Sequence, residues 1–223
     1  MTTETRRTRD PLSLAKTVTA ALYGYIAGQG LLMLTDFMEI GWLASLPEGT
    51  LVEGLETPGT QGMIIALGRM IFMVTWLVAA FLVLKWIYRA NLNARAFSPA
   101  KTVSPPWSIG WFFIPFASLW MPFRAMSETW RISDNPSGWT KAKAPSLLIV
   151  WWTLFLTSAV ADNISFRVQL MAETASGLIV ADWASLLGSA LGIPLSFVLI
   201  KMVREISQMQ AIRLEPGLAQ VFS

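Results

Sequence analysis

The sequence predicts an all-α integral membrane protein, a bundle of four spanning helices. The first observation is composition: of 223 residues, 54% are hydrophobic and only 14% are charged, whereas soluble domains carry roughly 25% charge. The second is the presence of four apolar stretches, each long enough to cross the hydrocarbon core. The third is that Lys and Arg gather on one side of the predicted membrane. Because lipid cannot satisfy backbone N–H and C=O groups, each stretch is expected to be helical.

The chain begins with a polar, basic tail, residues 1–16, and the remainder, 17–223, is predicted to form a single membrane domain. The first apolar stretch is too long for a signal-peptide core and lacks a convincing small-residue cleavage site. We therefore expect it to be retained as an anchor. The four predicted spans cover approximately residues 17–43, 63–88, 146–168 and 183–203.

Residues 105–133, between the second and third spans, do not fit an ordinary span. Residues 105–123 carry no charge and contain four prolines. Pro115 breaks a continuous helix because its ring clashes with the preceding turn, so we expect two short helical pieces hinged near Ile114 and Pro115. These pieces either enter the membrane from the cytoplasmic side and return, or lie in the interface. Pro122 suits the first turn of the helix that follows.

Orientation follows from the positive-inside rule. If 105–123 does not span, 15 of the 17 Lys and Arg residues lie on one side, and only Arg69 and Arg167 lie on the other. If 105–123 spans, the distribution becomes nine against eight. The rule therefore favours four spans with both termini in the cytoplasm. The outer loop 44–62 agrees, because it contains three glutamates and no cation.

The cytoplasmic boundary is rich in tryptophan and in cations. Eight of the eleven tryptophans fall near it, which indicates either a lipid-interface belt or a binding surface for a partner or lipid. These are Trp86, Trp107, Trp111, Trp120, Trp130, Trp139, Trp151 and Trp152. Cations near the same boundary set the topology or hold anionic lipid headgroups. These are Lys85, Arg89, Arg95, Arg124, Arg131, Lys141 and Lys143.

The stretch WIYRANLNAR, followed by SPPWSIGWFFIPFASLWMPFRAMSETW, closely resembles a bacterial membrane-protein family, domain of unknown function 4328. The matching residues are Trp86, Tyr88, Arg89, Asn93, Ala94, Ser104, Pro105, Trp107, Gly110, Trp111, Pro115, Trp120, Pro122, Ala125, Met126, Glu128 and Trp130. The resemblance covers about 45 residues, and the flanking spans match only in hydropathy. It implies a multi-span protein of the bacterial plasma membrane, and it implies no activity.

Three ionisable residues lie toward the outer ends of their predicted spans: Asp36, Arg69 and Asp162. They are candidates to meet at similar depth, as an ion pair that fixes the helices or as a gate or cation site. Glu39, Asn163 and Arg167 are predicted members of the same polar rim.

Small residues recur at four-residue spacing in the first and fourth spans, a pattern that lets helix backbones approach closely. The pattern predicts packing within the monomer, or else self-association or docking on another membrane protein. The residues are Ala20, Gly24, Gly28, Ala184, Gly188, Gly192 and Ser196. Pro194 is predicted to kink the fourth helix.

The chain has no cysteine and no histidine. Disulfides, thiolate nucleophiles, Cys or His metal sites and histidine-ligated haem are therefore excluded. We see no nucleotide-binding or hydrolase motif, and we expect no cofactor, no metal and no nucleic-acid partner.

These observations favour a non-catalytic accessory or scaffold protein that interacts with lipid, with another membrane protein or with itself. A small transporter or channel is the alternative, because proline-broken segments and intramembrane charges can line pores. An interfacial lipid-modifying enzyme that uses Glu128 or Asp134 is a lower alternative.

Overall fold

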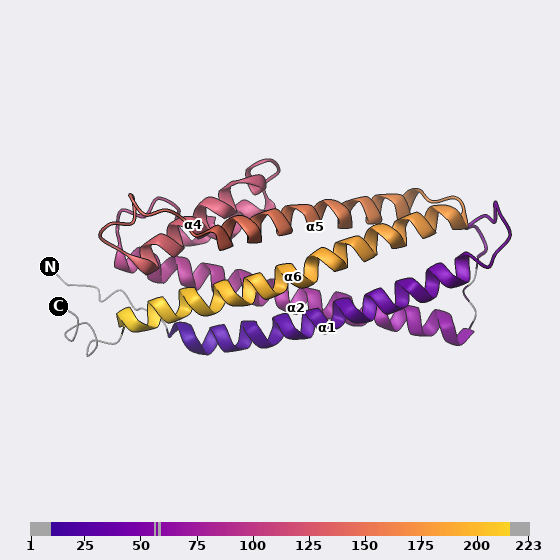
Figure 1. The fold of residues 1–223 in the computed structure, drawn as a ribbon, viewed down its shortest axis with the longest axis horizontal. Helices are drawn as coiled ribbons and strands as arrows, with labels where there is room; N and C mark the ends of the chain where they lie inside the picture. The colour runs from indigo at the N-terminus through magenta and orange to yellow at the C-terminus, as the bar shows by residue number, and fades with distance from the viewer. Residues whose placement is uncertain (1–9, 56, 58, 215–223) are drawn as a thin grey trace. The chain divides into compact units, whose positions relative to one another are not determined.

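The computed structural model describes residues 10–55, 57 and 59–214. Most of the predicted tail (1–9), Glu56 and the C-terminal residues 215–223 lie outside the described residues. The described chain is helical, with one isolated bridge between Leu51 and Thr174. Its helices are α1 (Pro11–Leu43), α2 (Gly59–Phe97), α3 (Pro105–Gly110), α4 (Met121–Asp134), α5 (Ser146–Met171) and α6 (Ala175–Leu214), with the 3-10 turns η1 (Trp111–Phe113) and η2 (Ala117–Leu119) between α3 and α4 (Figure 1).

Four helices of the described chain, α1, α2, α5 and α6, are long and apolar enough to cross a membrane, which confirms the four-span prediction. Two of them exceed the length that a span needs: α2 has 39 residues and α6 has 40. At 1.5 Å per residue, 40 residues measure about 60 Å, roughly twice the hydrocarbon thickness. At the N-terminus, α1 begins at Pro11, so residues 11–16 are helical and continue the first span.

The chain divides into two compact units, where the sequence indicated one membrane domain. Unit 1 contains residues 1–20, 80–152 and 198–223, and unit 2 contains residues 21–79 and 153–197. Each of the four long helices contributes to both units.

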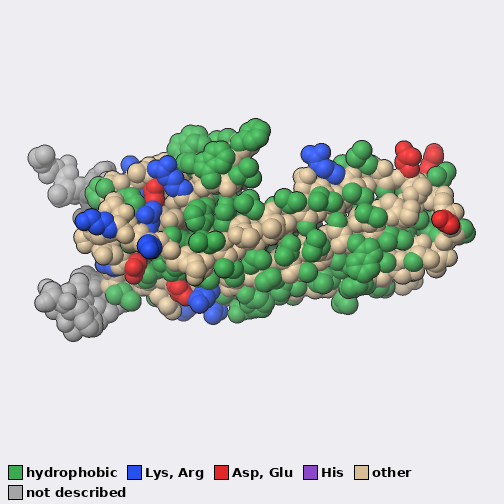
Figure 2. All heavy atoms as spheres, turned by 45° about the horizontal axis from the view of Figure 1, so that its top comes forward, with side chains coloured by type: hydrophobic (Ala, Val, Ile, Leu, Met, Phe, Trp, Pro, Cys, Tyr) green, Lys and Arg blue, Asp and Glu red, His purple; other side chains and the backbone are tan. Residues whose placement is uncertain are grey.

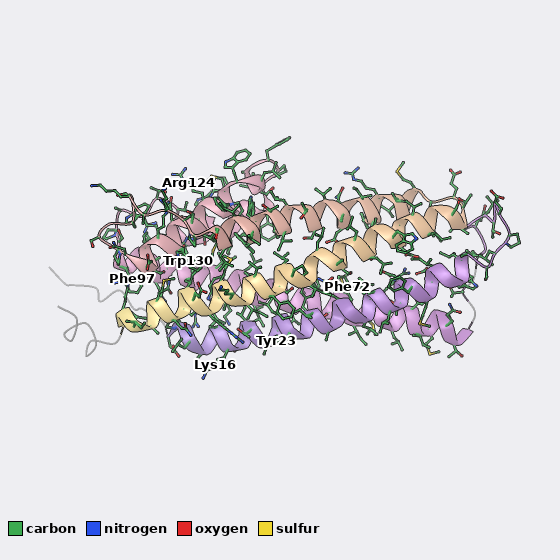
Figure 3. The ribbon with its side chains drawn as sticks, viewed as in Figure 1. Lys16, Tyr23, Phe72, Phe97, Arg124 and Trp130 are labelled. Carbon is green, nitrogen blue, oxygen red and sulfur yellow. The ribbon has the colours of Figure 1, made fainter. Side chains whose placement is uncertain are left out.

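Unit 1 is built around α4 and the C-terminal parts of α2 and α6. Its buried apolar side chains include Ile87, Ile132 and Ile206. Helix α4 is amphipathic: Trp130 is buried, whereas Arg124 points outward from the unit (Figure 3). Pro122 lies in the first turn of α4, as predicted, because a proline there removes only an N–H that has no helical partner.

Unit 2 has an apolar exterior and a more polar interior. Much of the face of α2 is exposed and hydrophobic, the surface that a lipid-facing helix presents. The exposed residues on this stretch of α2 are Met63, Ile64, Leu67, Met70, Ile71, Met73, Val74, Trp76, Leu77 and Val78. At one end of the unit, the loop after α1 joins the loop before α6, because Val52 N donates to Glu173 O at 2.9 Å.

Candidate functional site

The matched motif builds two features of unit 1, a projecting loop and a buried polar cluster. We name residues 105–120 the hook. It runs through α3 and η1, reverses, and returns through η2 into α4 (Figure 1). Pro105 occupies the first turn of α3 and is buried. At the other end, Trp152 Nε1 donates to Leu119 O at 2.9 Å, so the hook is attached to α5.

The reversal of the hook occurs where Pro115 predicted a hinge. Ile114 is extended, with φ −99° and ψ 118°, and ends η1. Phe116 then adopts φ 63° and ψ −53°. Ala117 N donates to Pro115 O at 2.8 Å, which closes a γ-turn centred on Phe116. A positive φ is unfavourable for a bulky residue, so the turn holds local backbone strain. The hinge prediction is confirmed.

The tip of the hook presents large apolar side chains outward. Phe113 and Phe116 are 74% and 78% exposed. Trp107, Leu119 and Trp120 are about half exposed, and the group forms a hydrophobic projection (Figure 2). Trp107 packs on Trp111, with ring centroids 4.6 Å apart.

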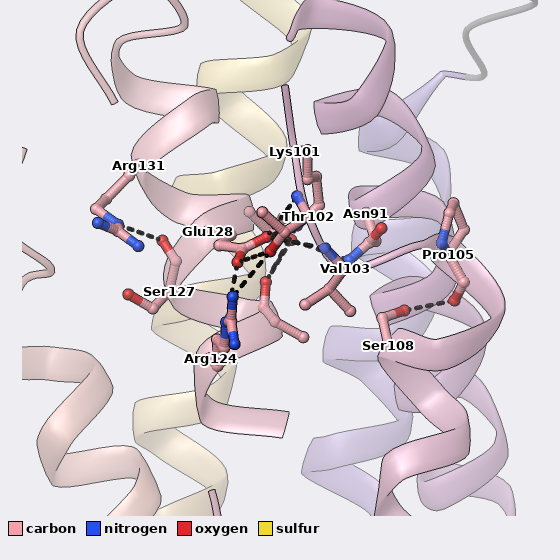
Figure 4. A network of polar contacts seen from close by, with 12 residues as sticks. Asn91, Lys101, Thr102, Val103, Pro105, Ser108, Arg124, Ser127, Glu128 and Arg131 are labelled. Carbon is pink, nitrogen blue, oxygen red and sulfur yellow. Dashed lines mark hydrogen bonds and ion pairs between the residues drawn. The ribbon is translucent and has the colours of Figure 1, made fainter. Parts of the chain in front are cut away.

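Beneath the hook, Glu128 of α4 is the centre of a buried polar cluster that we name the Glu128 clamp. It also contains Lys101, Thr102, Val103 and Arg124 (Figure 4). The Glu128 carboxylate accepts hydrogen bonds from Thr102 N at 3.2 Å and from Val103 N at 3.1 Å. It also accepts from the Thr102 hydroxyl, from Arg124 Nε at 3.3 Å and from Lys101 Nζ at 3.4 Å. The clamp therefore fixes the linker that leads into the hook onto α4.

Lys101 is the counter-charge of Glu128, and its side chain is fully buried. Its ammonium lies 3.5 Å from Ala125 O. Asn91 completes its surroundings in the amide orientation that satisfies both side-chain atoms: the oxygen accepts from Lys101 Nζ at 3.3 Å, and the nitrogen donates to Val103 O at 3.3 Å.

Burial and hydrogen bonding shift the titration of both charged groups. Burial lowers the pKa of the Lys101 ammonium from 10.5 to about 8, although the Glu128 carboxylate opposes that shift. Burial alone would raise the pKa of the Glu128 carboxyl. The Thr102 hydroxyl, the Val103 N–H and the charges of Lys101 and Arg124 together outweigh burial and hold that pKa below its ordinary 4.5.

A second buried network joins α2, α4 and α6 in unit 1. Gln210 Nε2 donates to Ala90 O at 2.9 Å and to Ser133 Oγ at 3.0 Å, and Asn93 Nδ2 donates to Gln210 Oε1 at 3.1 Å. Trp86 Nε1 donates to Ser207 Oγ at 3.1 Å. The network satisfies the buried Gln210 amide and the Trp86 indole N–H, so it specifies how these helices pack.

The structure places the other motif residues in supporting positions. Ser104 precedes α3 as its N-cap. Tyr88, Arg89 and Gly110 are partly buried. Ala94, Ala125, Met126 and Trp130 are buried in the core of unit 1.

The interpretation of the tryptophans as a lipid belt is wrong for five of the eight. Trp86, Trp130, Trp139, Trp151 and Trp152 are buried within unit 1. Trp139 has a specific role there, because the Arg131 guanidinium lies over its ring at 5.4 Å from the centroid. Hydropathy did not show that α4 and its flanking loops cover these rings.

In unit 2, Arg69 is the centre of a second group of charged residues, which we name the Arg69 cluster: Asp36, Glu39, Arg69, Asp182 and Ser185. Arg69 forms an ion pair with Glu39 of α1 and lies 3.5 Å from Asp182 Oδ1 of α6. Asp36 accepts a hydrogen bond from Ser185 Oγ at 2.7 Å. The sequence therefore named Asp36, Glu39 and Arg69, but not Asp182 or Ser185.

The remaining predicted members of the outer rim make other contacts. Asp162 lies against α6, where a Cβ added at Gly188 would overlap with its Oδ1 atom. Arg167 Nε donates to Asn163 Oδ1 at 2.8 Å on the exposed side of α5. In the described residues, the ion pairs of Arg69 are formed with Glu39 and Asp182 and not with Asp162.

Three of the predicted small residues are sites of close helix approach. A Cβ at Gly28 would overlap with Thr75 Oγ1, and one at Gly192 would overlap with Gln29 Nε2. Gly188 meets Asp162 in the same way. A Cβ at Gly24, in contrast, would meet nothing within 4 Å, and Ala20 is exposed. Ala184 is partly buried and Ser196 is buried.

No group of three or more acidic, Cys or His side chains in the described residues is arranged to hold a metal ion. The groups that the structure does assemble are a buried, fully hydrogen-bonded carboxylate in unit 1 and a carboxylate-rich cluster in unit 2. The first is suited to holding an exposed loop in place, and the second to binding positive charge.

A family model described as "Domain of unknown function (DUF4328)" matches residues 59–208, about two thirds of the chain. That range includes the hook, the Glu128 clamp and the Arg69 and Asp182 side chains. No curated protein and no solved structure matches the chain.

Proposed function

This chain belongs to the family of the domain of unknown function DUF4328, and we propose that it is a non-catalytic accessory or scaffold protein of the bacterial plasma membrane. Its termini face the cytoplasm in this proposal, because that arrangement places 15 of the 17 cations on the inner side.

The main support for the proposal is that the motif residues of unit 1 hold an exposed apolar hook in place. Glu128 is the carboxylate best placed for interfacial chemistry, yet five donors from Lys101, Thr102, Val103 and Arg124 already occupy its oxygens. What this clamp leaves exposed is an apolar hook tip. A motif that fixes a hydrophobic projection suits binding better than catalysis.

The lipid of the cytoplasmic leaflet is the first partner of the hook in this proposal. Residues 105–123 carry no charge, and the tip side chains Phe113 and Phe116 have apolar surface that lipid would cover. Arg124, one turn after Trp120, is exposed and suitably placed to meet an anionic headgroup. The hook would then be a re-entrant segment that enters the cytoplasmic leaflet and returns.

Depth measurement tests this insertion, and the absence of native cysteine makes the labelling specific. A spin label on Phe116→Cys, in nanodiscs, is expected to be accessible to oxygen and protected from a water-soluble relaxation agent. The matched control is Ser137→Cys, on the exposed loop after α4, which should show the opposite pattern. Equal exposure of both labels to the water-soluble agent would contradict insertion.

The accessory role itself is tested by isolating the full chain in native nanodiscs and measuring particle mass. We expect a defined complex, either with another membrane protein or with a second copy. Purified protein in proteoliposomes is expected to carry no ion or solute flux. A monomer without a partner that supports flux on its own would contradict the scaffold role.

A small transporter or channel is the second candidate, and the Arg69 cluster is the observation that favours it. Intramembrane charges commonly mark substrate or ion pathways. If transport is the role, Arg69→Gln or Asp182→Asn should change the flux in proteoliposomes while the particle mass stays the same.

A further inference from the structure

The Arg69 cluster contains more negative than positive charge. Asp36, Glu39 and Asp182 are 1%, 8% and 4% exposed, so all three carboxyl groups are buried. Within the described residues of unit 2, ion pairs supply them with a single cation, Arg69. If every group were ionised, three buried negative charges would face one positive charge between α1, α2 and α6. Buried like charges strongly disfavour that state.

A second observation, independent of the charge count, is an unsatisfied atom. Asp182 Oδ2 is buried and has no hydrogen-bond partner among the described residues, while Oδ1 is 3.5 Å from the Arg69 guanidinium. A buried carboxylate oxygen without a donor is costly and indicates a missing proton, water or ion.

The surroundings of Asp182 narrow the choice of ligand. The charged and titratable groups nearest to it are Asp36 and Glu39 from α1 and Arg69 from α2, and Asp162 of α5 lies against α6 at Gly188, two turns along from Asp182. These carboxylates do not converge as ligands of a metal ion would, among the residues that the structure describes. A water molecule would satisfy this oxygen but leave the excess of negative charge, whereas a proton removes one negative charge.

We propose that the Arg69 cluster is a proton-binding site, in which the carboxylate of Asp182 takes up one proton at Oδ2 and becomes a neutral carboxylic acid. Arg69 remains paired with Glu39, and Asp36 remains bonded to Ser185. Release of the proton leaves two uncompensated negative charges on the seam between α1 and α6 and weakens their packing. The site does not depend on the accessory role proposed above.

Infrared spectroscopy of the full chain in nanodiscs tests the site directly. The wild-type protein at neutral pH is expected to show the carbonyl band of a protonated carboxylic acid, shifted in D₂O and lost on alkaline titration. Asp182→Asn should remove this band. Glu48→Gln, which changes an exposed carboxylate in the loop after α1, should leave it unchanged.

Thermal unfolding gives a second readout. The folded chain holds a proton that the unfolded chain releases above the ordinary carboxyl range near pH 4, so stability should fall as the pH rises. For wild type we expect a loss of about 3 °C or more between about pH 6 and pH 8, below the range in which Lys101 titrates. Asp182→Asn should lose most of that dependence, because asparagine keeps the neutral state.

The infrared spectrum of the wild type tests the proposal by itself if Asp182→Asn does not fold. Absence of an exchangeable carboxylic-acid band in the wild type at neutral pH would overturn it. So would a band that Asp182→Asn retains. Stabilisation of the wild type by sodium relative to choline, without such a band, would assign an alkali-metal ion to the site in place of a proton.

Discussion

Glu128 is the residue on which the organisation of unit 1 depends most. We expect Glu128→Ala to destabilise the protein by about 3–5 kcal/mol, because it strands the fully buried charge of Lys101 and two backbone N–H groups. Thermal unfolding in detergent measures this loss. The matched control is Glu205→Ala, whose exposed pair with Lys201 spans 3.8 Å and should contribute less than about 1 kcal/mol. Equal effects of the two substitutions would contradict a structural role for the clamp.

The Glu128 and Lys101 charges predict that stability depends on pH in two separate ranges, an acid range for Glu128 and an alkaline range for Lys101. The Glu128 carboxyl has a lowered pKa when folded, so its contribution is present above pH 4.5 and is lost as the pH falls below that value. The folded pKa of Lys101, about 8, is below its ordinary 10.5, so the folded state binds fewer protons between these values and stability rises with pH there. Denaturant unfolding at pH 7, 8, 9 and 10 measures the alkaline part.

The control for this titration is Lys101→Met, which removes the ammonium and keeps an apolar stem. Its stability should lack the alkaline rise, a difference of about 1–3 kcal/mol between the two proteins across the window. Parallel curves for wild type and Lys101→Met would show that Lys101 does not titrate in this range.

At the scale of the elements, the small residues of α1 and α6 divide into two kinds. Gly188 touches Asp162 within unit 2, so Gly188→Ile should force α5 and α6 apart and cost about 1–3 kcal/mol. Gly24 has open space around it, so Gly24→Ile should change stability by less than about 0.5 kcal/mol. Thermal unfolding of both variants checks the difference.

Gly24→Ile also tests self-association, because no other atom lies close to this side of α1 at Gly24. If copies of the chain associate through that side, the variant should stay folded and shift to a smaller particle mass in nanodiscs. If Gly24→Ile lowered the stability and Gly188→Ile left it unchanged, the close contact would lie at Gly24 and not at Gly188, which would contradict the prediction.

At the scale of the whole molecule, the sequence predicted the features that follow from the physical properties of the lipid bilayer. The four spans follow from length and hydropathy, because lipid cannot satisfy backbone N–H and C=O groups and an apolar segment of this length must therefore be helical. The hinge at Pro115 followed from the chemistry of one residue. The clamp did not follow, since Glu128 binds Lys101 Nζ and the backbone N–H groups of Thr102 and Val103, all in a linker that no periodic pattern marks.

The long-range partners were also beyond the sequence. Arg69 and Asp182 are 113 residues apart, and the sequence predicted Asp36 and Asp162, but not Asp182, as neighbours of Arg69. Hydropathy measures where a helix meets lipid, so it carries no signal of the two compact units. It does not show that the C-terminal part of α2 packs in unit 1 with buried Asn91 and Asn93.

The topology of the whole molecule is the last prediction, and single cysteines test it in a chain that has none. Glu53→Cys, in the exposed loop between α1 and α2, should react with an impermeant maleimide added to intact spheroplasts. Ser137→Cys, exposed after α4, should react only after the membrane is opened. Ser98 is an unsuitable reporter because it is buried. External labelling of both positions would mean that 105–123 crosses the membrane, which would separate Lys101 from Glu128 and contradict the Glu128 clamp.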